Sequence, residues 1–135
     1  MAKNLYSKLG DVAYDGLVTD IEPPVIVRSG TIRKLGTAGT LKRGTILAKS
    51  SGSAGDGKLV ILGTTAASNE TLTPDCILTD DVAVGTSVDV VATVYYGGCF
   101  DLAKCDVKSG YTITTADKDV LREKGILFKN ASAAL

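Results

Sequence analysis

The chain has 135 residues, a length that suits one domain with a core of its own. Fifteen basic and fifteen acidic residues give a net charge of zero, which excludes the basic excess expected of a nucleic-acid or membrane-surface binder. Histidine is absent, so the sequence lacks the commonest general base, the Ser–His and Cys–His couples of nucleophilic catalysis, and the commonest metal ligand.

The composition predicts the fold class. Thr, Val and Gly are abundant, whereas Phe appears twice and Trp not at all. Val and Thr favour strands and Gly favours turns, so we expect a mainly β domain whose core of small side chains is completed in part by neighbouring subunits. The cysteines Cys76, Cys99 and Cys105 have no C-x-x-C spacing, and they fit neither a disulfide framework nor a zinc site.

The first 20 residues predict an arm, separate from a β-rich domain over residues 21–135. No apolar stretch has the length of a signal peptide or a membrane span, so we expect a soluble protein made in the cytoplasm. Gly10 and Gly16 disfavour a helix in the arm. The arm is either a disordered terminus or a segment that orders on a partner. A partner is favoured by six apolar residues, Leu5, Tyr6, Leu9, Val12, Tyr14 and Leu17.

Short strands are predicted in the middle of the chain. Pro24 forces Pro23 into an extended conformation and so ends the arm. The predicted elements that follow are strands over 25–28 and 31–35 around a Ser29–Gly30 turn, strands over 45–49 and 58–62, a polar loop over 66–74, a short strand over 76–78 and a turn at Asp80–Asp81. Adjacent carboxylates in a strand point to opposite faces, so we interpret Asp80 and Asp81 as a solvated turn rather than a cation site.

A short motif between two of these strands raises the possibility of nucleotide binding. Gly52, Gly57 and Lys58 match G-x-x-x-x-G-K, the beginning of a phosphate-binding loop. Such a loop needs a Ser or Thr after the Lys to hold magnesium, and it opens a helix. Here Leu59 follows the Lys and begins a strand pattern. The motif therefore predicts the loop of a β-hairpin.

The strongest strand pattern covers residues 87–96. Because strand side chains alternate between two faces, Asp89, Val91, Thr93 and Tyr95 are predicted to share one face. That face is half apolar, so we expect Val91 and Tyr95 to lie in an interface between subunits. Gly97–Gly98 is predicted to break the strand, which resumes over 99–102.

One helix is predicted near the end of the chain. Thr114 or Thr115 provides the N-cap, residues 116–124 form the helix and Gly125 ends it. Asp117 lies in the first turn, where a negative charge suits the helix dipole. A final strand is predicted over 126–128.

The order of these segments resembles a known family. The series runs YDGLVTDIEPPVIV, GTLKRGTILAKS, CILTDDVAVG, VVATVYYGGCFD and ADKDVLREKGILFKN, over roughly residues 14–130. It is similar to the head decoration proteins of tailed bacteriophages, the family of the lambda head protein D. The most distinctive parts are LKRGTIL (41–47), VYYGGCF (94–100) and DVLREKGILF (119–128).

The resemblance implies a compact β-clip domain and a homotrimer on the outer surface of the virion. Such a trimer would clamp neighbouring subunits of the major capsid protein after the shell expands, so that the shell withstands the pressure of packaged DNA. In this family the N-terminal arm meets the capsid. The resemblance implies no cofactor, no metal, no direct contact with nucleic acid and no membrane.

Two other functions stay open. A trimeric β-clip enzyme acting on nucleotides would need an acidic metal-binding or base-positioning loop, which the sequence does not supply without His or a clustered acid pair. We therefore expect no enzymatic activity. Another virion component, such as a tail or adaptor protein, would differ in oligomeric state and form a sixfold or twelvefold ring.

Overall fold

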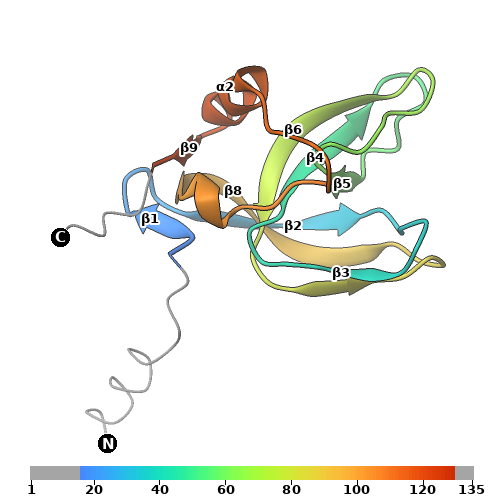
Figure 1. Cartoon of the computed structure of the whole chain (residues 1–135), viewed down its shortest axis with the longest axis horizontal. Helices are drawn as coiled ribbons and strands as arrows, with labels where there is room; N and C mark the ends of the chain where they lie inside the picture. Colours follow the sequence, from blue (N-terminus) through green and yellow to red (C-terminus); the bar gives the residue numbers. More distant parts are fainter. Residues whose placement is uncertain (1–15, 130–135) are drawn as a thin grey trace, which may run out of the picture.

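The computed structural model describes residues 16–129, which are mainly β with one short helix near the C-terminal end (Figure 1). This confirms the predicted fold class. The strands are β1 (Val18–Asp20), β2 (Ile26–Ile32), β3 (Gly39–Leu41), β4 (Ile46–Ser51), β5 (Leu59–Ile61), β6 (Thr71–Leu78), β7 (Val82–Val84), β8 (Val90–Phe100) and β9 (Ile126–Phe128). A short 3-10 helix, η1 (Leu102–Lys104), and the α-helix α2 (Thr115–Glu123) lie between β8 and β9.

Five strands close into a ring. In order around it, β2 pairs with β8, β8 with β6, β6 with β4, β4 with β5, and β5 with β2. All of these pairs are antiparallel except β2–β5, which meet in parallel at Ile32 and Leu59. β8 is the longest strand, and its far end also pairs with β1 and β9. The result is a compact, barrel-like sheet.

The sheet has an apolar cluster on each side. All five ring strands contribute to one cluster, which we place inside the ring because only there do their side chains converge. It contains Ile32, Leu47, Leu59, Cys76, Leu78, Ala92 and Val94. The separate two-stranded sheet of β3 and β7 adds Leu41 and Val84. The second cluster lies on the opposite side of β4, β5, β6 and β8. It is covered by Leu17, by Leu121 of α2 and by Ile126 of β9.

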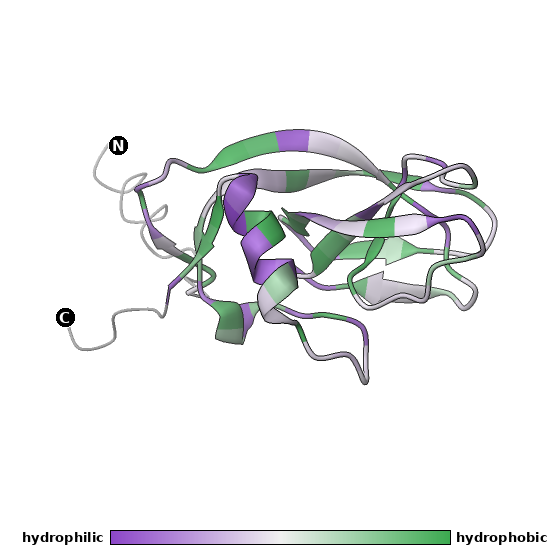
Figure 2. Ribbon diagram, turned by 90° about the horizontal axis from the view of Figure 1, so that it is seen from above, coloured by the Kyte–Doolittle hydropathy of each residue, from purple (hydrophilic) through white to green (hydrophobic). Residues whose placement is uncertain are grey.

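The hairpin and the helix agree with their predictions. β4 and β5 pair antiparallel across the glycine-rich loop. At the start of α2 the Thr114 hydroxyl accepts the Asp117 N–H, and the Asp117 carboxylate accepts the Thr114 N–H, which makes a capping box. Gly125, with φ of 94°, follows the helix. Figure 2 shows α2 with hydrophilic and hydrophobic bands, as expected of a helix that buries one side.

One strand replaces the two strands and the turn predicted around Ser29–Gly30. β2 runs unbroken, with Ser29 opposite Thr93 and Gly30 opposite Ala92 of β8. Gly30 is needed for close approach rather than for a turn, because a Cβ there would lie 2.6 Å from Leu59 Cδ1. The prediction was wrong because a glycine in a strand can mark a position where another side chain packs closely, as here, and not only a turn.

Two other boundaries also differ from the prediction. β6 begins at Thr71, inside the predicted polar loop, and it contains Pro74. The pairing of β6 with β4 shifts register at this point, so that a bulge accommodates the proline. β8 begins at Val90 rather than residue 87 and continues through Gly97–Gly98. At these glycines β8 exchanges its β2 partner for β1 and β9.

Candidate interaction surfaces

Most of the predicted capsid-binding residues lie outside the described residues: Leu5, Tyr6, Leu9, Val12 and Tyr14. Leu17 is the exception, and the structure corrects its assignment. Its side chain is 1% exposed and packs in the second apolar cluster, and its carbonyl accepts the Asp101 N–H. Val18–Asp20 then pair with β8. Residues 17–20 therefore belong to the folded domain, and Leu17 is not available to a partner.

Val91 and Tyr95, the predicted subunit interface, have different environments. Val91 is 69% exposed. Tyr95 is 9% exposed, packs on Phe100, and accepts a hydrogen bond from Arg43 Nη1 at 2.7 Å through its hydroxyl. Tyr95 is thus buried by side chains of its own chain rather than by another subunit. The prediction that it lies in a subunit interface was wrong, and it is a core residue.

Val91 instead belongs to a surface formed by β2 and β8. The register places Ser29 opposite Thr93 and Thr31 opposite Val91. Side chains two apart in a strand share a face, so the outward face of this strand pair is formed by Val27, Ser29, Thr31, Val91 and Thr93; we call it the ribbon face. None of these residues is charged, and Val27 is 49% exposed.

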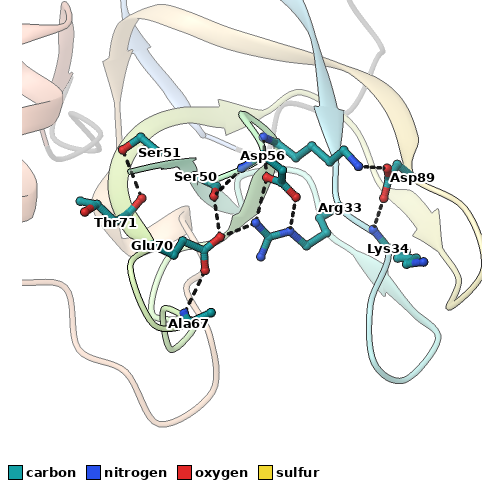
Figure 3. A network of polar contacts seen from close by, with 10 residues as sticks. Arg33, Lys34, Ser50, Ser51, Asp56, Ala67, Glu70, Thr71 and Asp89 are labelled. Carbon is teal, nitrogen blue, oxygen red and sulfur yellow. Dashed lines mark hydrogen bonds and ion pairs between the residues drawn. The ribbon is translucent and has the colours of Figure 1, made fainter. Parts of the chain in front are cut away.

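Two charged residues next to the ribbon face, Arg33 and Asp89, form ion pairs within the chain (Figure 3). Arg33 follows β2 and donates to both carboxylate oxygens of Asp56, at 3.0 and 2.9 Å, and to Glu70. Asp89 precedes β8 and forms an ion pair with Lys58 at 2.5 Å. Both clusters lie at the same end of the strand pair, because Arg33 follows Ile32 of β2, Asp89 precedes Val90 of β8, and Ile32 and Val90 are register partners. The ribbon face itself has no charged residue, and interface cores are typically depleted of charge in this way.

The contacts around Arg33 lower the pKa values of two carboxyl groups. Bonds from Arg33 first, and from the Lys58 N–H, hold the pKa of Asp56 at about 2. Bonds from the Ala67 N–H, the Ser50 hydroxyl and Arg33 hold the pKa of Glu70 at about 2. The Arg33 cluster joins β2 to the 52–58 and 62–70 loops. It was not predicted, because its partners lie 23 and 37 residues from Arg33 and no local pattern marks them.

The phosphate-loop motif is a hairpin loop, as predicted. Gly52 and Gly57 have φ values of 89° and 75° and shape the turn. Lys58, the residue that would contact a phosphate, is instead paired with Asp89, and a strand follows it rather than a helix. The loop thus lacks the backbone arrangement of a phosphate site.

The remaining candidate groups for chemistry are dispersed. Across residues 16–129 no three His, Cys, Asp or Glu side chains cluster where they could share a metal ion. Cys76 and Cys99 are buried and Cys105 is half-buried. Burial raises the pKa of the Cys105 thiol to about 12, with Asp101 and Asp106 adding to the effect. Asp80 and Asp81 lie in an exposed turn, where Asp81 accepts the Arg43 N–H at 2.8 Å.

No protein-family model matches the chain, and no curated protein is significantly similar to it. Among the described residues, no helix combines the length and apolarity that a membrane crossing requires.

Proposed function

We propose that the protein decorates the outer surface of a phage head, where it binds the major capsid protein as a homotrimer and stabilises the expanded shell. The observation that carries the proposal is the ribbon face, which is uncharged and displays Val27 and Val91 at 49% and 69% exposure. Subunits packed together through this face would bury both valines without burying a charge. The order of segments that resembles the decoration family supports the same role.

The physical basis of the role is multivalency. A trimer presents three copies of each capsid contact, and linked contacts raise avidity by about 10²–10⁴ over a single one. Weak individual contacts then suffice for firm attachment. In this proposal the subunits meet through the ribbon face, and the residues before Gly16 supply one capsid contact on each subunit.

The test is co-sedimentation with undecorated, expanded capsids. The full-length chain should sediment with them at a stoichiometry of three copies per threefold position. A chain lacking residues 1–14 should stay folded, because Leu17 and β1 are retained, but it should bind the capsids at least about tenfold more weakly.

Two outcomes would contradict the proposal in different ways. Full-strength binding by the shortened chain would move the capsid contact from the arm to the domain surface. Failure of the full-length chain to bind capsids, together with labelled protein at the neck or tail of virions, would favour a tail or adaptor role.

A further inference from the structure

β2 has one open edge. Its other edge pairs with β8 along the whole strand, whereas the open edge meets β5 at a single position, where Ile32 lies opposite Leu59. Among the strands of the described chain, only β5 and β8 pair with β2. The residues from Ile26 to Ser29 are all exposed, with Ile26 at 48% and Val27 at 49%. This stretch of the edge is therefore accessible to a further strand.

Unpaired backbone groups line the open edge. The Arg33 N–H donates to the Leu59 carbonyl at 2.9 Å, so the backbone of Arg33 faces β5. Backbone groups point alternately to the two edges of a strand, and those of Val27 and Ser29 therefore face the same way as Arg33. β5 does not extend to them, because it pairs with β2 only at Ile32. An extended segment beside β2 would satisfy these groups, which is how strand addition gains affinity.

A positive charge lies beside these groups. Arg28 is exposed, and its guanidinium lies over the Tyr96 ring, with 5.5 Å from Cζ to the ring centroid. It has no ion-pair partner among residues 16–129. Two copies of β2 paired edge to edge about their centres would bring two Arg28 side chains opposite each other, and like charges in such a pair are destabilising. A segment that carries a carboxylate on the Arg28 side is favoured instead.

The arm contains a segment of this kind. Residues 10–14 read GDVAY. In an extended conformation Val12 and Tyr14 share one face, and Asp11 lies on the other. If Val12 and Tyr14 continue the ribbon face, Asp11 falls on the side of Arg28, because Arg28 points away from that face. Residues 1–10 have two lysines and no acidic residue, so they do not match the charge at this edge.

The geometry excludes this pairing within one chain. The Leu17 carbonyl accepts the Asp101 N–H, and Arg28 lies opposite Val94, so Leu17 and Arg28 are about 23 Å apart along the direction of β8. Asp11 precedes Leu17 by six residues, which span at most about 20 Å when fully extended. The chain before Leu17 also runs away from β2, since β1 and β2 are both antiparallel to β8. A turn that reversed it would use part of this length, so the segment beside β2 must come from a second copy.

We propose that residues 10–14 of one subunit add a strand to the open edge of β2 in a neighbouring subunit, with Asp11 beside Arg28. This inference rests on the proposed function and names a contact that holds its trimer together. Three such exchanges close a ring, as a head-to-tail contact in a cyclic trimer does. The exchange adds backbone hydrogen bonds to the ribbon-face contact and leaves residues 1–9 of each arm for the capsid.

A charge exchange in the full-length protein tests the pairing of Asp11 with Arg28. Asp11→Arg and Arg28→Asp should each raise the dissociation constant of the trimer at least about fivefold, as measured by sedimentation equilibrium. The double variant should return it to within about twofold of the wild type. Asp11→Arg combined with Lys108→Asp, an exposed change elsewhere in the domain, should not. A double exchange that restores nothing would overturn the inference.

Cross-linking identifies the occupant of the edge. Full-length Val12→Cys and full-length Ser29→Cys are mixed and treated with a short bifunctional maleimide, and each variant alone controls for the native thiols. The mixture should give a covalent dimer that joins Cys at position 12 of one chain to Cys at position 29 of the other. A link formed only within a chain that carries both substitutions would assign the edge to the chain's own arm. Absence of any link to position 29 would also overturn the inference.

Capsid binding separates this inference from the proposed function. If the mixed chains cross-link but the wild type does not co-sediment with expanded capsids, the decoration role falls and the arm exchange stands. If the wild type co-sediments with capsids but the chains do not cross-link, the arm exchange falls and the decoration role stands. A wild type that stays monomeric at every concentration would likewise overturn the arm exchange.

Discussion

Gly30 lies in the middle of β2, where the inner face of the strand meets two core side chains. A Cβ at this position would come within 2.6 Å of Leu59 Cδ1 and 3.6 Å of Val94 Cγ2. Leu59 is 2% exposed and Val94 is fully buried, so neither has free space into which to move. The absence of a side chain at this one residue is what allows β2 to approach β5.

Gly30→Ala should therefore destabilise the protein. We expect the free energy of unfolding to fall by about 1–3 kcal/mol, the usual cost of overpacking a filled core, as measured by urea denaturation. Gly36→Ala is the matched control, because a Cβ at Gly36 would meet nothing within 4 Å. Equal stability of the two variants would show that the core relaxes around the added methyl group.

Glu70 and Asp56 should make stability sensitive to acid. Their pKa values of about 2 in the folded chain lie below the values of about 4 expected in the unfolded chain. Their stabilisation is thus fully present above about pH 5 and is lost as the pH falls toward 2. We expect Tm to decrease over this range.

Two substitutions isolate the contribution of Glu70. Glu70→Gln should lower Tm at pH 7 and reduce its further decrease between pH 5 and 2, because one of the carboxyl groups with a lowered pKa is gone. Glu22→Gln should leave the decrease unchanged, since Glu22 is exposed and forms no ion pair among the described residues. A Tm profile of Glu70→Gln parallel to the wild type would contradict the assignment.

At the scale of elements, α2 depends on its N-terminal cap. Thr114→Ala removes the hydroxyl that accepts the Asp117 N–H. It should lower the free energy of unfolding by about 0.5–2 kcal/mol in urea. Thr115→Ala, one residue inside the helix, should change it by less than about 0.5 kcal/mol, and a loss as large as that of Thr114→Ala would show that the capping box is not the cause.

Elements that depend on contacts between residues close together in the chain could be predicted, whereas those that depend on distant residues could not. The cap of α2 and the β4–β5 hairpin rest on residues close to one another in the chain, and both follow from the sequence. β9 was predicted from the apolar run that follows Gly125, although its partner β8 lies far from it in the chain. The start of β6 was missed because Pro74 normally ends a strand, and only the register shift against β4 tolerates it. The two-stranded sheet of β3 and β7 was not predicted, because its strands have three residues each and are too short to show an alternating pattern.

The candidate surfaces were predictable only in part. Val91 stood out because it is an apolar residue on the polar side of an alternating strand. Its partners in the ribbon face, Val27 and Thr31, were hidden by the turn predicted at Ser29–Gly30. Tyr95 has the same parity as Val91, and only tertiary contacts with Arg43 and Phe100 distinguish it.

At the scale of the whole molecule, the ribbon face should govern subunit association. Three copies of the 13.9 kDa chain give about 42 kDa, which light scattering of the free protein, or the stoichiometry on capsids, should report. Val91→Glu places three like charges near one another and should raise the dissociation constant of the trimer at least about tenfold.

Val88→Glu is the matched control for this association. Val88 is 67% exposed, close to the value for Val91, but it lies outside the ribbon face. It should leave the trimer intact. A stable dimer, a hexameric ring, or equal weakening by both variants would remove the geometric basis of the proposed assembly.

The central place of β8 has a consequence for the order in which the protein is made. β1, β2 and β6 all pair with residues 90–100, so none of them completes its ladder until about a hundred residues have been translated. At a synthesis rate of about 5–20 residues per second, that takes about 5–20 s. During this time Val25, Ile26 and Val27 are part of the nascent chain, while β8, the partner strand of β2, has not yet been synthesised. A chaperone that binds short apolar segments should therefore find this chain while it is still on the ribosome.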